Sequence, residues 1–299
     1  MSEANGILVT GATGNVGSEV CKNLQESGRP IYGAVIAPEV NEDGTPTERT
    51  ASRLYGSEPR GFDFTNESTW ASALEGVQKV FLMRPPHISK IKRDMYPFMQ
   101  FMKERGIEHV VFLSVQGVEN NKMIPHYKVE ESILELGIPY TFIRPSFFMQ
   151  NMSTTHLSEI RDESRIFVPA GDGVTNFIDV RDIGEAVARA LLGDEHKNRA
   201  YTVTGEVSYS YYEVAERLSE ILGRTITYEP ARAIPFLRYQ KKQGRKLGHA
   251  LVMYVLYSVT RLGKAGVATE AFGELTGRKP RSLDEFIRDH KAALGAAVS

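Results

Sequence analysis

The feature that most constrains this chain is a set of glycines near its N-terminus, Gly11, Gly14 and Gly17. They follow the apolar run 7–9 and precede an apolar pattern of helical spacing over residues 16–24. A strand, a glycine-rich turn and a helix in this order form the context of a dinucleotide-binding turn. The glycines allow a sharp exit from the strand, a close approach of backbone N–H groups to a pyrophosphate, and tight packing of the helix on the sheet.

The spacing of this turn is GxxGxxG rather than the GxGxxG of many dehydrogenases. We expect a bound dinucleotide to contact the residues of the turn itself. These residues are Gly11, Thr13, Gly14, Asn15, Val16 and Gly17.

The choice between NAD and NADP is normally made at the end of the second strand, expected here over residues 30–36. An acid at that point binds the ribose hydroxyls, whereas an arginine accepts a 2′-phosphate. Ile36 occupies the strand end, and Glu39 is the nearest acid, although the proline before it turns the chain. Arg49 and Arg53 follow in a short predicted helix and could fold back onto a 2′-phosphate. The sequence leaves NAD and NADP as alternatives.

Several further apolar runs end in residues that belong at the carboxyl edge of a parallel sheet, where ligands of such sheets bind. Asp63 either faces the cofactor or caps the helix that begins near Asn66, and Ser114 either binds a carbonyl of the ligand or caps a turn. The cofactor-binding residues expected outside the glycine turn are Asp63, Phe64, Met83, Arg84, Pro85, Ser114, Lys128 and Pro145.

The composition excludes several classes of function. A formal net charge of −1 provides no field that favours nucleic acid. A single cysteine, Cys21, excludes an internal disulfide and fits a reducing compartment. No secretory leader is recognisable, and the longest apolar stretch, 250–259, is shorter than the roughly 20 residues of a spanning helix. We therefore expect a cytoplasmic protein with a small-molecule substrate, and a homodimer or a protein partner remains open.

Strands and helices alternate over some two hundred residues, which predicts an α/β Rossmann-type fold with a doubly wound parallel sheet. We expect a dinucleotide-binding domain over residues 1–150, to which residues 176–205 return. Residues 151–175 and 206–299 are expected to form a smaller α+β substrate lobe.

The substrate lobe begins with an apolar cluster beyond a strand end. Phe147 and Phe148, together with Asn151 and Phe177, are the expected walls of a substrate pocket. Further on, a basic run over residues 238–246 precedes the apolar stretch 250–257. This order fits either an interfacial membrane anchor or, as we favour, a helix that packs over the substrate cleft.

Together these segments resemble the NmrA-like, atypical branch of the short-chain dehydrogenase/reductase superfamily. The resemblance covers nearly the whole chain. It rests on residues 10–17, Leu113-Ser114, the helix 126–136, residues 137–145 and 179–183, and Gly277-Arg278-Lys279-Pro280 with Phe286. The family includes NAD(P)H-dependent quinone and azo-dye reductases, isoflavone-type reductases, and regulators that bind the nucleotide without turning it over. The resemblance implies NAD(P) binding and hydride transfer.

The chain departs from the superfamily pattern at the catalytic pair Tyr-x-x-x-Lys, because Ile124 stands four residues before Lys128. In that pair the lysine lowers the pKa of the tyrosine for proton donation. Helical geometry places His126 nearest the apolar face, Lys128 at its boundary and Tyr127 on the far side. Lys128, His126 and Tyr127 are the candidate catalytic residues; the alternatives are a surface ion pair with Glu131 for Lys128 and a core position for His126.

Two functions follow from these observations. The first is an NAD(P)H-dependent reductase of a planar, conjugated acceptor such as a quinone, which can take its proton from water. The second is a redox sensor that binds NAD(P) and passes a conformational change to a partner. The missing tyrosine favours the second function.

Overall fold

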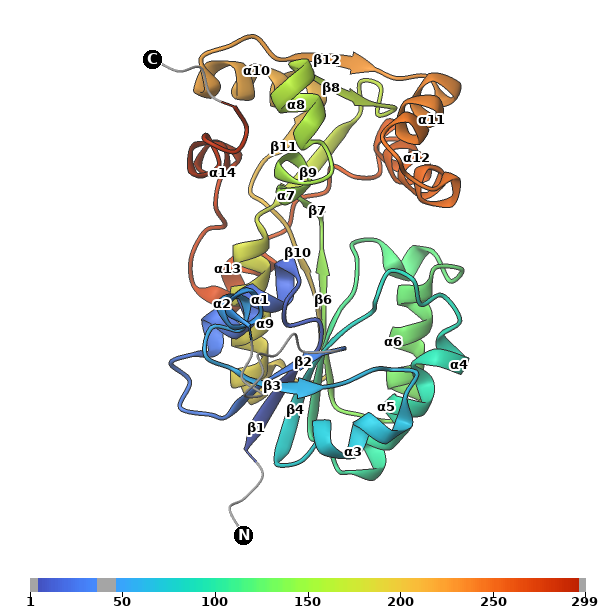
Figure 1. Ribbon diagram of the computed structural model, residues 1–299, viewed down its shortest axis with the longest axis vertical. Helices are drawn as coiled ribbons and strands as arrows, with labels where there is room; N and C mark the ends of the chain where they lie inside the picture. Colours follow the sequence, from blue (N-terminus) through green and yellow to red (C-terminus); the bar gives the residue numbers. More distant parts are fainter. Residues whose placement is uncertain (1–4, 37–46, 296–299) are drawn as a thin grey trace. The chain divides into compact units, whose positions relative to one another are not determined.

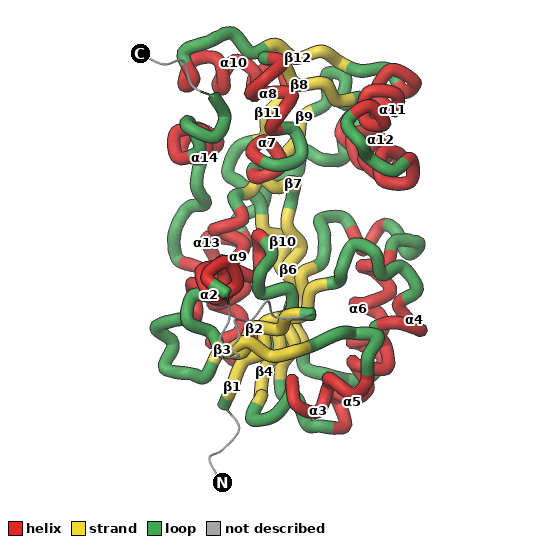
Figure 2. Tube along the Cα trace, in the orientation of Figure 1, coloured by secondary structure: helices red, strands yellow, loops and turns green. Residues whose placement is uncertain are grey.

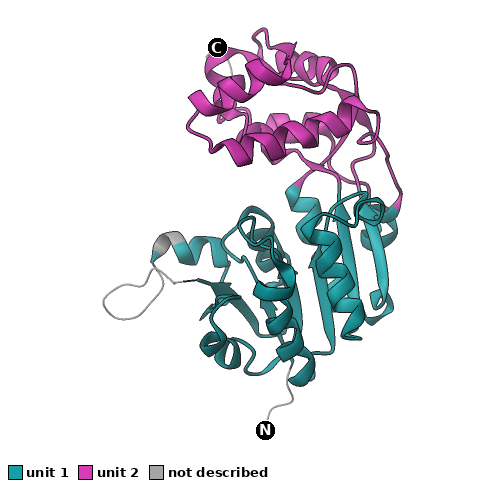
Figure 3. Cartoon of the chain, turned by 90° about the vertical axis from the view of Figure 1, so that its right-hand side faces the viewer, with its two compact units in different colours: residues 1–145, 180–203, 271–278 teal, residues 146–179, 204–270, 279–299 magenta. Residues whose placement is uncertain are grey.

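The computed structural model describes residues 5–36 and 47–295, without the side chains of Glu48 and Arg49. Its internal contacts divide the chain into two compact units, drawn in different colours in Figure 3. Unit 1 comprises residues 1–145, 180–203 and 271–278, and unit 2 comprises residues 146–179, 204–270 and 279–299.

Unit 1 is built on a parallel sheet whose strands run in the order β10-β6-β5-β4-β1-β2-β3 (Figure 1). The strands are β1 (Gly6–Val9), β2 (Ile31–Val35), β3 (Glu58–Gly61), β4 (Val77–Met83), β5 (His109–Leu113), β6 (Tyr140–Pro145) and β10 (Arg199–Val203). The chain runs outward from β1 to β3, and then resumes at β4 on the other side of β1. The carboxyl ends of β1 and β4 therefore flank the point where strand order reverses, which is where open α/β sheets bind ligands.

Helices cover both faces of this sheet (Figure 1). One face carries α1 (Asn15–Leu24) and α9 (Val180–Leu192), with α2 (Glu48–Leu54) and α13 (Ala271–Thr276) nearby. The other face carries α3 (Trp70–Ala73), α4 (Ile91–Asp94), α5 (Tyr96–Glu104) and α6 (Pro125–Glu135). Short 3₁₀ turns occupy residues 67–69, 118–120 and 194–196.

The packing of α9 on α1 depends on a small residue. A Cβ atom built on Gly184 of α9 would lie 2.5 Å from the Cβ of Glu19 in α1 and 2.9 Å from its carbonyl carbon. Backbones that approach so closely leave no room for a side chain. The pair α1 and α9 therefore forms one layer, and α1 is held in place behind the glycine-rich turn.

Unit 2 contains two small sheets surrounded by helices (Figure 2). One has the order β11-β9-β7, from β11 (Ser208–Ser210), β9 (Val174–Ile178) and β7 (Phe147–Phe148). The other pairs β12 (Thr227–Pro230) with β8 (Arg165–Val168). The helices are α7 (Gln150–Ser153), α8 (Leu157–Glu163), α10 (Tyr211–Leu222), α11 (Ala233–Lys242), α12 (Leu247–Arg261) and α14 (Leu283–Asp289).

The expected Rossmann-type fold with a doubly wound parallel sheet is confirmed. Two local expectations differ from the structure. Residues 61–64 read in the sequence as a short strand, but the third strand covers Glu58–Gly61, because Phe62 and Phe64 turn into an aromatic cluster with Phe98. The segment 271–278 lies in unit 1, where α13 packs on α9 and β10. No helix of the described residues is long and apolar enough to cross a bilayer.

A buried histidine makes the stability of unit 1 dependent on pH. His109 of β5 has no exposed surface, and its Nε2 lies 2.8 Å from Thr141 Oγ1 on β6. Because that hydroxyl donates to the carbonyl of His196, Nε2–H must be the donor to Thr141. Burial, followed by the charge of Lys79, lowers the pKa of His109 to about 4. The unfolded chain therefore binds a proton below about pH 6.5 that the folded chain does not bind.

We expect the free energy of unfolding to decrease as the pH falls from 7.5 to 5, with His109 contributing about 2 kcal/mol of the decrease. The variant H109Q removes this titration, so its unfolding free energy should depend less on pH by that amount. Urea denaturation at the two pH values measures the difference. H87Q, at an exposed histidine of the same unit, is the control. Equal pH dependence of H109Q and the unsubstituted protein would contradict this account.

Candidate functional site

The glycine-rich turn leaves β1 at the point where strand order reverses. Thr10 fixes the exit, because its Oγ1 donates to the carbonyl of Phe81 at 3.0 Å and accepts from the N–H of Met83 at 2.8 Å. Gly11 then adopts a φ of +64°, in the left-handed region that favours glycine. A Cβ atom built at Gly11 would also lie 2.2 Å from Met83 Cε. Both the conformation and the space of the turn therefore require glycine here.

The turn presents the N-terminus of α1 without a side-chain cap. Gly14 is the N-cap residue, and no side chain of the described residues caps the helix there. A Cβ atom at Gly17 would lie 2.1 Å from the carbonyl oxygen of Gly11, so the first helical turn packs directly on the backbone of the loop. Thr13 is half-buried, Asn15 is exposed, and the Val16 side chain belongs to the core. Unpaired N–H groups and the helix dipole make such a helix start an anion site.

The loop after β4 borders the same turn. Met83 contacts the Gly11 position, and Arg84 is followed by Pro85 and Pro86. Arg84 Nη1 donates to the carbonyls of Pro85, Pro86 and Ile88 at 2.9, 3.2 and 2.7 Å, so the guanidinium holds its own loop in shape. Its Nε is buried without a hydrogen-bond partner among the described residues, and burial lowers the pKa of Arg84.

Asp63 and Phe64 follow β3 and have local partners. Asp63 Oδ1 accepts from the N–H and the hydroxyl of Thr65 at 2.7 and 2.8 Å, which closes a turn, while Asn66 caps the next helical segment. The ring of Phe64 is buried against Phe98 with centroids 5.6 Å apart. A ligand would therefore meet the backbone of Phe64 rather than its ring.

Ser114 and Pro145 lie at the carboxyl ends of β5 and β6. The N–H of Ser114 donates to Ile143 at 2.8 Å, and Pro145 accepts from the N–H of Gln116 at 3.0 Å. The Ser114 hydroxyl is buried and has no hydrogen-bond partner among the described residues. An unpaired buried hydroxyl costs about 1–3 kcal/mol, so its position calls for an explanation such as a ligand contact.

The helix α6 carries the candidate catalytic residues. Ile124 is its N-cap and Pro125 its first residue, so the position four residues before Lys128 lies outside the helix. His126 and Tyr127 are half-buried, and Lys128 is exposed. Burial, followed by the charge of Arg84, lowers the pKa of His126 to about 4. His126 is therefore neutral near pH 7 and cannot serve there as a general acid.

A buried ion pair that the sequence did not reveal fixes α6 on the sheet. Arg144 of β6 contacts Glu130 through Nε–Oε1 at 3.0 Å and Nη2–Oε2 at 2.6 Å, and Glu119 through Nη1 at 3.3 Å. Glu130 is buried, and a paired, fork-like geometry offsets the cost of burying its charge. In the sequence, Arg144 stands out only as a member of the segment 137–145, on which the family resemblance partly rests. The spacing of 14 residues carries no pattern that pairs it with Glu130.

Arg53 reaches the glycine-rich turn from α2. Its Nη1 donates to the carbonyl of Thr13 at 2.7 Å. The helix is held there because Leu54 packs on Gly33 of β2, where an added Cβ would lie 2.4 Å from Leu54 Cδ2. Glu39 lies outside the described residues, and Arg49 contributes only its backbone to α2. Ile36, at the end of β2, is 71% exposed.

In unit 2, three of the four residues expected to bind substrate line one cavity. Phe147, Asn151 and Phe177 surround a space of about 10 Å³, which is room for one water molecule. Phe148 is half-buried in β7 and does not line this cavity. The remaining lining residues are Met152, His156, Ile160, Ile166, Tyr211 and Tyr257.

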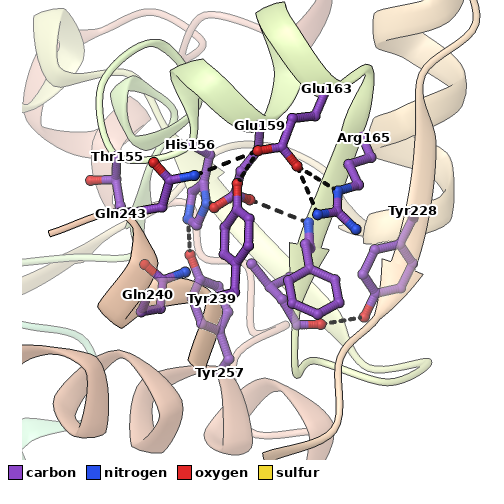
Figure 4. A network of polar contacts seen from close by, with 12 residues as sticks. Thr155, His156, Glu159, Glu163, Arg165, Tyr228, Tyr239, Gln240, Gln243 and Tyr257 are labelled. Atoms are coloured by element: carbon purple, nitrogen blue, oxygen red, sulfur yellow. Dashed lines mark hydrogen bonds and ion pairs between the residues drawn. The ribbon is translucent and has the colours of Figure 1, made fainter. Parts of the chain in front are cut away.

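Two of the polar lining residues, His156 and Tyr257, belong to a buried network that sequence analysis missed (Figure 4). His156 precedes α8, and its Nδ1 lies 3.1 Å from Glu159 Oε2. Its Nε2 contacts the hydroxyl of Tyr257 on α12. The spacing His-x-x-Glu is a usable signal for the first contact. The second joins residues 101 positions apart, and only the fold could bring them together.

The chain is similar to known proteins along nearly its whole length. The model of the NmrA-like family matches residues 3–287. An NAD(P)H azoreductase of Xenophilus azovorans is 31% identical over 97% of this chain and 100% of the relative. Prestalk A differentiation protein A of Dictyostelium discoideum is 30% identical over 95% of this chain and 91% of the relative. The structure of the Citrobacter sp. triphenylmethane reductase complexed with NADP(H) matches with a TM-score of 0.80 and 23% identity, covering 95% and 99% of the two chains.

These matches place the site in a family. The family model and the relatives match nearly the whole chain, and the Rossmann-type sheet with its glycine-rich turn is consistent with that match. The chain belongs to the NmrA-like family. The resemblance drawn from the sequence motifs is thereby confirmed.

The contact of Gly17 with Gly11 gives a test of the turn. In G17A the methyl group would displace the Gly11 carbonyl, so we expect NADPH to bind at least tenfold more weakly. In G14A the added Cβ lies 3.2 Å from the same oxygen, and the loss should be smaller. G248A, where a Cβ meets nothing within 4 Å, is the control. Fluorescence titration with NADPH measures the affinities. Unchanged affinity in a folded G17A protein would contradict this role.

Proposed function

We propose that this protein is an NAD(P)H-dependent reductase of small conjugated acceptors such as quinones or azo dyes. The observation that carries the proposal is the uncapped N-terminus of α1 directly behind the Gly11–Gly17 turn. Support comes from the azoreductase that is 31% identical over its full length. A turn of this shape positions backbone donors for a pyrophosphate and leaves the reacting ring to other residues.

The residues of unit 1 fit a dinucleotide. A Cβ atom at Gly11 would clash with Met83, and one at Gly17 would clash with the carbonyl of Gly11, so the turn keeps its shape only with glycine at both positions. The helix start behind it has no side-chain cap and offers N–H groups to phosphate oxygens. Met83, Arg84 and Pro85 would border the cofactor from β4, and Pro145 from β6. The unpaired hydroxyl of Ser114 is a hydrogen-bond donor for its amide or ribose groups.

When bound, the cofactor supplies a hydride, and the residues of this chain bind and orient the cofactor and the acceptor. The glycine-rich turn binds and orients the pyrophosphate. Lys128 is exposed, and we propose it as a donor to a ribose hydroxyl; neutral His126 can donate or accept a hydrogen bond without carrying a charge. In unit 2 we propose the half-buried Phe147 as an aromatic contact of a planar acceptor, whereas Phe177 is buried and packs behind it in the lining of the small cavity.

A second candidate function is a redox sensor that binds NAD(P) without turnover. It is favoured by Ile124, which replaces the tyrosine of the Tyr-x-x-x-Lys pair and lies outside α6. A sensor would bind oxidised and reduced nucleotide with different affinities and would oxidise neither NADH nor NADPH.

One experiment separates the two functions. The purified protein is first titrated with NAD, NADH, NADP and NADPH, and the tighter reduced form is then mixed with a panel of quinones and azo dyes. We expect acceptor-dependent loss of absorbance at the dihydronicotinamide band. Binding without oxidation by any acceptor would reject the reductase and support the sensor.

We further propose that the cofactor is NADP(H) and that Arg53 binds its 2′-phosphate. Arg53 is held 2.7 Å from the carbonyl of Thr13, on the edge of the turn where the adenosine ribose leaves the pyrophosphate. The exposed apolar Ile36 offers no carboxylate to the ribose hydroxyls of NAD. A guanidinium pairs with a phosphate through charge-assisted hydrogen bonds.

The variant R53A tests this assignment. Loss of one exposed charge-assisted contact should weaken NADPH binding about tenfold, which corresponds to about 1.4 kcal/mol, and should change NADH binding less than twofold. R105A removes an arginine that stacks on Phe101 on the other face of the sheet and should alter neither affinity. Equal weakening of NADH and NADPH in R53A would reject a 2′-phosphate contact.

A further inference from the structure

The helix α12 is apolar on two opposite faces. Its inner face packs in unit 2 through the buried residues Ala250, Met253 and Tyr257. Its outer face is exposed and consists of Leu247, Leu251, Val252, Val255, Leu256, Val259 and Leu262, the last of which directly follows the helix. A helix that is apolar all round is normally buried on every side. The composition of α12 therefore calls for a second apolar contact that the described residues of unit 2 do not provide.

Exposed apolar side chains are concentrated on this outer face. Among the described residues sixteen large hydrophobic side chains are exposed, and seven of them belong to it. Apolar side chains scattered singly over a surface are common, whereas a contiguous apolar patch marks a surface that binds a partner or a membrane. The helix α11 lies beside α12 (Figures 1 and 2), and Phe236 packs on Tyr254 and Tyr257 with ring centroids 6.5 and 6.3 Å apart. Together the two helices form one surface of unit 2.

The residues around the outer face are basic. The segment 231–269, which holds both helices, contains eight lysines and arginines and no aspartate or glutamate, although the formal net charge of the chain is −1. Seven of these cationic side chains are exposed: Arg232, Arg238, Lys241, Lys242, Lys246, Arg261 and Lys264. None of the seven forms an ion pair with a carboxylate of the described residues. Positive charge therefore flanks the outer face at both ends of α12 and along α11.

We propose that α11 and α12 dock on an anionic lipid bilayer. The outer face of α12 enters the boundary between headgroups and acyl chains, and the surrounding lysines and arginines meet the anionic headgroups. The helix lies along the surface, because no helix of the described residues is long and apolar enough to cross a bilayer. An interfacial anchor was one of the two alternatives for this segment in the sequence, and the exposed outer face with its unpaired cations favours it. The inference does not rest on the proposed reductase function.

Charge decides between a bilayer and a second copy of this chain. Both ends of α12 are basic, because Lys246 precedes the helix, Arg261 ends it and Lys264 follows. A parallel or an antiparallel pairing of two outer faces would therefore bring like charges together, which costs free energy. An anionic bilayer has the opposite effect, because it combines a negative surface potential with an apolar layer beneath it.

Vesicle sedimentation tests the docking. The full-length protein is mixed with large unilamellar vesicles of phosphatidylcholine, with or without roughly 30% phosphatidylserine. We expect binding to the anionic vesicles and about tenfold weaker binding to the neutral ones, because the cations contribute only against anionic headgroups. Raising NaCl from about 0.1 to about 0.5 M should weaken the binding, since salt screens exposed charges. Equal binding to both vesicles, or binding to neither, would overturn the proposal.

The variant V252Q/V255Q tests the apolar contribution. Both valines are 60% exposed, and glutamine is a good helix former, so the fold should be preserved. Loss of two inserted side chains should weaken binding to anionic vesicles about tenfold. Leu134 and Val207 are each 51% exposed and lie outside the outer face, so L134Q/V207Q is the matched control and should bind like the unsubstituted protein. Unchanged binding in V252Q/V255Q would reject insertion of α12.

The variant K241Q/K242Q tests the electrostatic contribution from α11. We expect it to bind anionic vesicles about tenfold more weakly. The control K90Q/K291Q removes the same charge from two exposed lysines elsewhere and should leave the binding unchanged. Equal weakening in both variants would assign the effect to net charge rather than to this surface, and would overturn the proposal.

Two other occupants of the outer face give different results. If a second copy covers it, light scattering will show a dimer that V252Q/V255Q converts to a monomer, and vesicles will not bind. If the face contacts a small acceptor, V252Q/V255Q will raise the KM for that acceptor and leave vesicle binding unchanged. Either result would overturn docking on lipid.

A fluorescent label locates the contact on the chain. The chain has one cysteine, Cys21, which is buried, so a thiol-reactive NBD dye labels an introduced cysteine selectively. The dye emits at shorter wavelength when it leaves water for an apolar phase. We expect this change for labelled V255C on addition of anionic vesicles, and no change for labelled V207C. The same response at both positions, or at neither, would contradict docking through the outer face.

Discussion

The contact on which the rest of the site depends is the packing of Gly17 on the carbonyl of Gly11. It brings the start of α1 directly against the backbone of the turn, and it is possible only without side chains. The close approach of Gly184 to Glu19 then holds α1 from behind, so α9 supports the turn although it lies far along the chain. Thr10 ties the same turn to β4. A site for a dinucleotide thus arises from backbone geometry, with few side chains involved.

In unit 2 the buried polar contacts are made by side chains on separate elements. His156 and Glu159 belong to one segment, and Tyr257 comes from α12. Aromatic rings surround this polar set, which raises the cost of an unpaired charge and strengthens each hydrogen bond.

Much of the fold was predictable, because periodic apolar patterns and glycine positions are local properties. The apolar run 77–83 predicts a strand, and the patterns over 125–134 and 211–222 predict helices; the structure has β4 at Val77–Met83, α6 from Pro125 and α10 at Tyr211–Leu222. The third strand was misplaced because the apolar residues Phe62 and Phe64 pack in an aromatic cluster rather than in the sheet. The return of α13 to unit 1 has no local signal, because packing on α9 decides it.

The sequence by itself determined the Rossmann-type sheet, the glycine-rich turn, the family and the absence of the tyrosine four residues before Lys128, since each is written in spacing along the chain. Only the tertiary structure decided that Arg53 meets Thr13, that Glu130 meets Arg144 and that His156 meets Tyr257. The physical reason is that a hydrogen bond depends on distance in space. Residues separated by 14, 40 or 101 positions come within 3 Å of each other only after the apolar core has fixed the elements that carry them.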